Sequence, residues 1–249
     1  MVVAHCDDET IGASHQLLRG HHDAQILHVT DSAPLDPVYA QRAGFATRQA
    51  YAKVRRQEML AAMSRIGIRA TQCHVLAIPD QEAPRRIAEI AAAVEHLVAK
   101  GGITRVFTHA FEGGHPDHDA CALAVHIALR VRRGVRLFEM PFYHAAGGPM
   151  IAAQFLPHPD AGKVIDKSLS LANTIRRQTM FKCFPTQAHV FERFPIAREP
   201  YRLAPHHDFR QPPHALPLYY ETRPLNWTWP AWHQATAPAI SHFLDNRKR

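Results

Sequence analysis

The sequence contains little cysteine and no long apolar run, and both absences narrow the class of protein. Its four cysteines, Cys6, Cys73, Cys121 and Cys183, form no C-x-x-C pair, so we expect reduced thiols and neither a disulfide framework nor a cysteine zinc site. No stretch of about 18 uninterrupted apolar residues is present to span a bilayer. The opening Met1-Val2-Val3-Ala4 also lacks the basic and apolar regions of a secretory signal. These features predict a cytoplasmic protein without a transmembrane segment, unless the natural chain starts earlier.

Positive charge is in excess, with a formal net charge of +7 and a pI near 9.5. Such a balance suits an anionic partner. The basic residues fall in short pairs such as Arg55-Arg56 and Arg176-Arg177, without an aromatic-interleaved basic stretch or a known nucleic-acid motif. We therefore expect no nucleic-acid binding, and the sequence assigns no oligomeric state.

Strand and helix patterns alternate as far as Met140, which predicts right-handed crossovers and a parallel sheet. The expected strands are 2–4, 26–30, 74–78, 105–108 and 135–140, and the expected helices are 10–19, 45–66, 85–100, 119–132 and 168–181. Outside the last helix, the Pro-rich chain after Met150 is expected to be irregular. The prediction is an α/β fold, a Rossmann-like three-layer α/β/α sandwich with a mostly parallel sheet. It forms a single domain over 1–249, in which 146–249 completes the 1–145 core and the substrate pocket.

Two polar clusters follow predicted strands, at the edge where parallel sheets gather functional groups. His5-Cys6-Asp7-Asp8-Glu9 follows the first strand, and His115-Pro116-Asp117-His118 follows strand 105–108. A catalytic zinc takes three imidazole or carboxylate ligands and keeps one position open. His5, Asp8 and His118 supply such a set, for Zn²⁺ or another divalent metal such as Fe²⁺.

The remaining polar residues of the clusters suit proton transfer. Asp7 would accept a proton from the metal-bound water, and His115 would steady the oxyanion or protonate the leaving nitrogen. Asp117 would orient an imidazole. Considered singly, Asp8 or Glu9 would more often be a helix cap than a functional group. The pairing of both clusters at equivalent strand ends favours a metal hydrolase.

The same residues resemble the PIG-L/LmbE-like family of zinc-dependent N-acetylglucosaminyl deacetylases. The family motif A-H-P-D-D-E is matched at 4–9 except that Cys6 replaces the proline, and the motif H-P-D-H is complete at 115–118 after Gly113-Gly114. Weaker matches are Thr30-Asp31, Arg55 with Glu58 leading to Gly67, and Pro79-Asp80. The resemblance implies a zinc-dependent N-deacetylase that hydrolyses a linear amide in a small N-acyl amino sugar, such as an N-acetylglucosamine derivative, or in a glycoconjugate.

The resemblance also implies roles for single residues. Arg55 and Asp80 match positions that contact substrate hydroxyls or phosphate, and Tyr143 matches a substrate-side tyrosine. Alternatively, Arg55 is a helix-surface charge, Asp80 a turn residue and Tyr143 a packing ring. The implied set is zinc on His5, Asp8 and His118, Asp7 as general base, and His115 with its partner Asp117 at the intermediate and the leaving amine.

Cys6 departs from the family motif, because proline would stiffen the turn between ligand and base. A cysteine at this position adds a thiol that could oxidise or bind the metal. We expect that Cys6→Pro keeps activity. Complete loss of bound zinc in that variant would indicate that the thiol is a ligand.

Two rival functions use the same residues. His5, Asp7 and His118 could form the two-histidine, one-carboxylate triad of a non-haem iron oxygenase, although such oxygenases usually occupy all-β barrels. The chain could instead be a non-catalytic metal-containing module that binds an anionic glycan. Metal analysis with an oxygen-uptake assay separates the first rival from a hydrolase, and the exact substrate and acyl group stay open.

Overall fold

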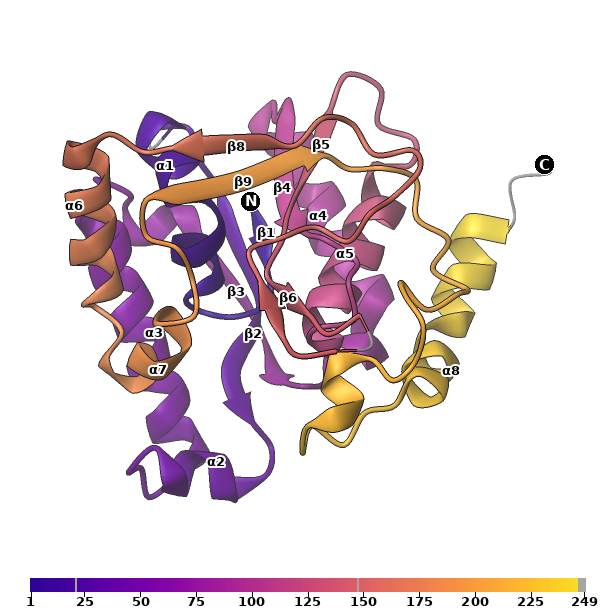
Figure 1. Cartoon of the computed structure of the whole chain (residues 1–249), viewed down its shortest axis with the longest axis horizontal. Helices are drawn as coiled ribbons and strands as arrows, with labels where there is room; N and C mark the ends of the chain where they lie inside the picture. Colours follow the sequence, from indigo (N-terminus) through magenta and orange to yellow (C-terminus); the bar gives the residue numbers. More distant parts are fainter. Residues whose placement is uncertain (21, 147, 246–249) are drawn as a thin grey trace. The chain divides into compact units, whose positions relative to one another are not determined.

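The computed structural model describes residues 1–20, 22–146 and 148–245 (Figure 1). The chain divides into two units, each with its own strands and helices. The first comprises Met1, Val3–Asp80 and Ile165–Pro200, and the second comprises Val2, Gln81–Val164 and the chain from Tyr201. The single domain expected over 1–249 stays a prediction.

A three-stranded sheet, which apart from Val2 belongs to the first unit, has the strand order β1-β2-β3. Their bounds are Val2–Val3, Ile26–Pro34 and Cys73–Asp80. β2 and β3 pair in parallel. Leu27 N donates to Met1 O at 2.9 Å, and Thr30 N donates to Ala4 O at 2.9 Å. Because these two bonds advance in the same direction along both segments, β1 is also parallel to β2.

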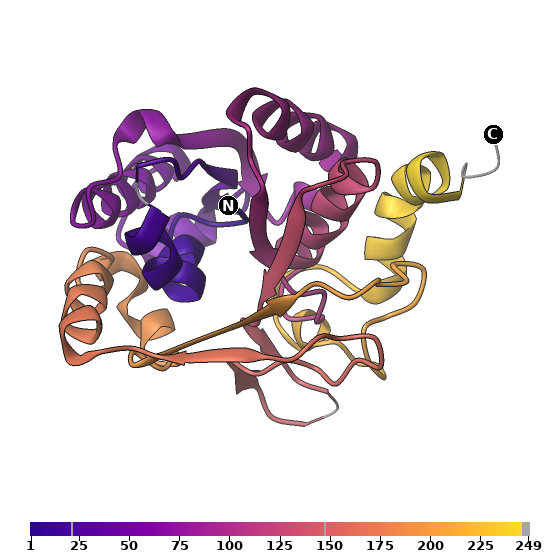
Figure 2. The same cartoon turned by 90° about the horizontal axis from the view of Figure 1, so that it is seen from above.

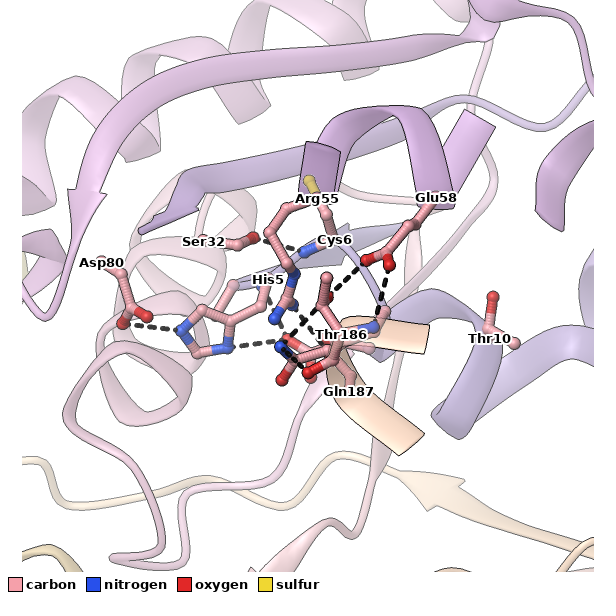
Figure 3. Close-up of polar contacts among 12 residues, drawn as sticks. His5, Cys6, Thr10, Ser32, Arg55, Glu58, Asp80, Thr186 and Gln187 are labelled. Carbon is pink, nitrogen blue, oxygen red and sulfur yellow. Dashed lines mark hydrogen bonds and ion pairs between the residues drawn. The ribbon is translucent and has the colours of Figure 1, made fainter. Parts of the chain in front are cut away.

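Helices α1 (Asp8–Gly20), α3 (Arg48–Ser64) and α6 (Leu171–Phe181) belong to the first unit, where α6 contacts both α1 and α3 (Figures 1 and 2). The unit also contains α2 (Pro37–Arg42), η1 (Ala70–Gln72), β8 (Ile165–Ser168), η3 (Pro185–Gln187), α7 (Ala188–Phe191) and the start of β9 (Arg198–Leu203). The buried face of α3 carries two charged side chains, Arg55 and Glu58, among its apolar residues. Glu58 accepts hydrogen bonds from the N–H and hydroxyl of Thr186 at 3.0 and 2.6 Å (Figure 3). Both buried charged groups of α3 are thus hydrogen-bonded, because Arg55 donates to Asp7 in the turn after β1.

The second unit pairs β4 (Arg105–His109) with β5 (Arg136–Met140) in parallel. The end of β9 pairs antiparallel with β5, with Phe138 opposite Leu203. Helices α4 (Ile87–Gly101) and α5 (Pro116–Leu129) pack against each other, and α5 also contacts β4. The other elements are η2 (Ala83–Arg86), β6 (Tyr143–His144), β7 (Ile151–Ala152), η4 (Tyr219–Thr222), α8 (Trp229–Ile240) and η5 (Ser241–Asp245).

The predicted α/β class is confirmed, and the mostly parallel sheet is confirmed in part. β1, β2 and β3 are parallel, as are β4 and β5, but β9 is antiparallel. The expectation of largely irregular chain after Met150 is wrong, because β8, β9, α7 and α8 lie there. α8 begins after the N-cap Thr228 and buries Trp229 and Trp232, whose indole N–H donates to Pro116 O at 3.0 Å. The proline content of this region hid that amphipathic helix.

All four cysteines are free thiols, as predicted, and Cys6, Cys73 and Cys121 are buried. Among the described residues, no helix combines the length and apolar character that crossing a membrane requires. The predicted absence of a spanning helix therefore holds for that part of the chain. The cytoplasmic location stays a prediction.

Candidate active site

His5 lies in the turn between β1 and α1, and both of its ring nitrogens face carboxylates. Nδ1 lies 3.3 Å from Asp8 Oδ2, and Nε2 lies 3.1 Å from Oδ1 of Asp80 at the end of β3 (Figure 3). The backbone N–H of His5 donates to the same Asp8 oxygen at 2.7 Å. Asp8 therefore stabilises the turn through the His5 backbone, and its carboxylate also lies next to the His5 imidazole.

The His5 and Asp8 pair fits a zinc ion. Ligand atoms about 2.0–2.1 Å from a tetrahedral zinc lie about 3.3 Å from each other, and the Nδ1 to Oδ2 distance agrees with that value. In the tautomer protonated on Nε2, Asp80 accepts the hydrogen bond of His5 and Nδ1 keeps its lone pair for a metal. Asp80, expected from the resemblance to contact substrate, thus has a geometry that orients His5, and its substrate contact stays a prediction.

Asp7 is paired with a second residue that the resemblance assigned to the substrate. Arg55 Nη2 donates to Asp7 Oδ2 at 2.9 Å, and both side chains are buried. Burial raises the pKa of Asp7 to about 6, and the positive charge of Arg55 opposes that rise. Arg55 therefore holds the carboxylate of the expected base, while its contact with a substrate stays a prediction.

The buried thiol of Cys6 is held in its protonated form. Burial raises the pKa of this thiol to about 12, and a thiol binds metal or reacts through its thiolate. The Ser32 side chain, which hydrogen-bonds to this thiol, opposes the rise.

Glu9 forms a buried pair that the sequence analysis missed. Its Oε2 lies 2.9 Å from Nε2 of His28 on β2, and its Oε1 accepts from the Thr10 hydroxyl at 2.7 Å. Glu9 and His28 are fully buried. A signal was present, because a histidine within a strand expected to be buried needs a polar partner.

In the second unit, the H-P-D-H residues form the first turn of α5. His115 is the N-cap, and its Nδ1 accepts from Asp117 N at 3.2 Å. Pro116 occupies the first helical position, where no N–H is needed, so α5 starts at Pro116 and not at 119 as predicted. The ring of His118 stacks on His109 of β4, with 3.9 Å between centroids and 10° between planes. His109, which the sequence analysis did not single out, therefore packs against the ring of a predicted ligand.

Asp117 joins this turn to the chain at the start of η2 by hydrogen bonds. Its Oδ2 accepts from Gln81 N at 2.6 Å, and its Oδ1 accepts from Ala83 N at 3.1 Å. Asp117 Oδ2 also lies 4.0 Å from His115 Nδ1. Asp117 is thus beside His115 but is bonded mainly to backbone, so a role as its partner stays a prediction.

Tyr143 packs against His118, with ring centroids 5.6 Å apart. Its backbone N–H and that of Phe142 donate to Oε1 of the buried Glu112, at 2.9 and 2.7 Å. Burial also raises the pKa of Glu112 well above its ordinary value. Glu112, another residue missed from the sequence, therefore holds the chain at Tyr143, whose substrate contact stays a prediction.

Gly114 is required by this packing, and Gly114→Ala tests it. A Cβ at this position would lie 1.9 Å from the backbone oxygen of Tyr143. We expect the free energy of unfolding of Gly114→Ala to fall by about 1–3 kcal/mol, the usual cost of overpacking. Urea denaturation measures this change. Gly20→Ala is the matched control, since nothing lies within 4 Å of the added methyl. Equal stability of the two variants would contradict the close approach.

The structure links His5, Asp7, Asp8, Arg55 and Asp80 within the first unit, and His115, Asp117, His118 and Tyr143 within the second. The expected metal set of His5, Asp8 and His118 takes residues from both units. It stays a prediction.

A family model described as "PIG-L: GlcNAc-PI de-N-acetylase" matches residues 1–129, which is 129 of the 249 residues and just over half of the chain. Comparison with curated proteins gave no match. The family match contains both polar clusters.

Solved structures with a similar fold include enzymes of more than one kind. The A40926 pseudoaglycone deacetylase Dbv21 is 20% identical, with a TM-score of 0.64 over 81% of this chain and 94% of its own. A zinc-inhibited form of the teicoplanin deacetylase Orf2 is 14% identical, with a TM-score of 0.65 over 83% and 98%. The 4-carboxy-2-hydroxymuconate hydratase GalB of Pseudomonas putida KT2440 is 13% identical, with a TM-score of 0.54 over 83% and 96%. At these identities the likeness shows the fold alone.

Proposed function

The chain belongs to the PIG-L family, and from this premise we propose that it is a zinc-dependent deacetylase that hydrolyses the linear amide of an N-acyl amino sugar. One observation carries the proposal: His5 Nδ1 and Asp8 Oδ2 lie 3.3 Å apart, beside an Asp7 carboxylate that Arg55 holds at 2.9 Å. The fold alone would not support this choice, because a hydratase shares it.

In the proposed site, His5, Asp8 and His118 hold the metal. When bound, the ion would supply a positive charge that polarises the amide carbonyl and acidifies water. Imidazole and carboxylate ligands suit Zn²⁺, and they can also bind Fe²⁺, which is the alternative metal.

Asp7 and His115 divide the proton transfers in this proposal. Asp7 takes the proton of the attacking water, and Arg55 keeps the Asp7 carboxylate in place. His115 Nδ1 accepts a backbone hydrogen bond, so the proton of the neutral ring is on Nε2, the nitrogen that would donate to the departing amine. Tyr143 and Asp80 would line the substrate side, near their contacts with His118 and His5.

The proposed substrate is a small molecule or glycoconjugate that contains N-acetylglucosamine or a related N-acyl amino sugar. The family description supports the amino sugar, since it names a GlcNAc-PI de-N-acetylase. The formal charge of +7 favours an acidic group, such as a phosphate, elsewhere on the substrate.

Metal removal tests the proposal. Protein loaded with Zn²⁺ is screened for primary-amine release from N-acyl amino sugars with and without phosphate groups. Chelation is expected to lower the rate at least about 100-fold, and added Zn²⁺ to restore it. Amine release that survives chelation, or no release from any substrate by metal-loaded protein, would contradict the proposal.

The same preparation addresses the two rivals. Oxygen uptake by Fe²⁺-loaded protein, without amine release, would favour the oxygenase. Glycan binding by metal-loaded protein without turnover would favour the binding module. A deacetylase is expected to release amine without consuming oxygen.

A further inference from the structure

Two side chains of β2 hold the backbone on both sides of His5. The Thr30 hydroxyl donates to Ala4 O at 2.8 Å, immediately before His5. Immediately after His5, the backbone N–H of Cys6 donates to Ser32 Oγ at 2.7 Å (Figure 3). Ser32 N donates to Thr30 Oγ1 at 3.1 Å, which joins the two contacts. The backbone around His5 is therefore clamped by one short segment of β2.

Ser32 adopts a backbone conformation that serine seldom takes. Its φ is +60°, in the left-handed region that non-glycine residues disfavour. The pairing of β2 with β3 shifts register in the same place, between Thr30 and Pro34. Such a conformation persists only where the surrounding structure holds it, and Ser32 is 2% exposed. The packing around Ser32 therefore holds its backbone in this unfavourable conformation.

We propose that Ser32 is a positioning residue for His5, acting through the backbone N–H of Cys6. The hydrogen bond fixes the turn in which His5 and Asp8 stand 3.3 Å apart. The inference rests on the proposed function, in which these two residues hold the metal. In this proposal residue 6 acts through its N–H, and Cys6→Ala separates that contact from the contact of its thiol with Ser32.

Proline cannot make this contact, because it has no backbone N–H. Cys6→Pro would leave Ser32 Oγ buried without the donor that it has in this chain. The proposal therefore predicts weaker zinc binding in Cys6→Pro, in contrast to the expectation from the sequence that this variant keeps activity. Cys6, which replaces the proline of the family motif, thus supplies an N–H that the Ser32 hydroxyl on β2 accepts.

The test compares zinc affinity across four variants by competition with a chromophoric chelator. Ser32→Ala removes the acceptor and Cys6→Pro removes the donor, and each is expected to raise the zinc Kd about ten-fold or more, as for other residues that orient metal ligands. Cys6→Ala keeps the N–H and is expected to match wild type. The double variant Cys6→Pro/Ser32→Ala is expected to be no weaker than either single variant, since both remove one bond.

Amide hydrogen exchange of residue 6 in metal-free protein provides a second readout, independent of activity. Ser32→Ala is expected to speed this exchange, whereas Ser64→Ala, at an exposed serine of α3, is expected to leave it unchanged. If Ser32→Ala does not fold, Cys6→Pro tests the same bond from its other end. Unchanged zinc affinity in both would overturn the inference, as would an effect of Cys6→Ala equal to that of Ser32→Ala. A wild-type chain that binds no zinc would instead overturn the proposed function, and the exchange comparison would still decide whether Ser32 holds the turn.

Discussion

Asp7→Asn is expected to lower amine release by about 10²–10⁴-fold, the usual contribution of a general base, while bound metal is retained. Asparagine has the shape of aspartate and can still accept the hydrogen bond that Arg55 donates at 2.9 Å, but it cannot take a proton from water. His5 and Asp8 are unchanged, so the proposed donors remain. The measurements are kcat/KM for amine release and metal content per chain.

A matched control for Asp7→Asn is Asp166→Asn. Asp166 also pairs with an arginine of the first unit, Arg198, but this pair lies at the surface. Its loss is expected to leave kcat/KM within about two-fold, because exposed ion pairs contribute little. Turnover by Asp7→Asn within a few-fold of wild type would exclude Asp7 as the base, and loss of metal from that variant would make Asp7 a ligand.

Local patterns in the sequence predicted the strands and the longer helices up to Met140 and the two polar clusters, but missed the short helix α2 (Pro37–Arg42). His5 and Asp8 are three positions apart and fall in one turn, so their contact follows from the strand-turn-helix pattern. The start of α5 at Pro116 was available from the sequence in principle, since histidine followed by proline is an acceptable helix start.

The partners of the site residues could not be predicted in the same way, because they come from distant parts of the chain. Ser32 lies 26 positions after Cys6, and Glu112 lies 30 positions before Phe142. Arg55 meets Asp7 over 48 positions. Nothing in the residue pattern of a single segment specifies such pairs, and the register shift at Ser32 has no separate sequence signal.

The break within α1 is a further example of a distant cause. Ala13 has non-helical backbone angles, φ −151° and ψ 31°. In a regular helix the N–H of His15 would donate to the carbonyl of Ile11, and the break at Ala13 lies between these two groups. Arg177 of α6 donates to the Ile11 carbonyl, and Glu199 of β9 accepts from His15 N at 2.8 Å. The two side chains replace the lost helical hydrogen bond.

Arg177→Ala is therefore expected to lower the free energy of unfolding by about 3–5 kcal/mol, the usual cost of breaking a buried ion pair from one side. Arg177 and Glu199 are almost fully buried and lie 4.0 Å apart. The neighbouring Arg176 is exposed, so Arg176→Ala is the matched control and is expected to change stability by less than about 0.5 kcal/mol. Urea unfolding at pH 8 measures both, and equal stability of the two variants would show that the buried pair does not hold α1.

The loss in Arg177→Ala should also depend on pH, because it follows the charge of Glu199. Burial raises the pKa of Glu199 from 4.5 to about 7, and Arg177 opposes the rise. A raised carboxyl pKa contributes stability below the unfolded value of 4.5, and this contribution is lost as the pH rises through 7. Without Arg177 the pKa rises further, so at pH 5 Glu199 is neutral in both proteins, whereas at pH 8 the variant must either bury an unpaired carboxylate or bind a proton. The difference in unfolding free energy between wild type and Arg177→Ala is thus expected to be smaller at pH 5 than at pH 8. If the difference is the same at both pH values, the stability comes from the hydrogen bonds of Arg177 to backbone carbonyls and not from its charge.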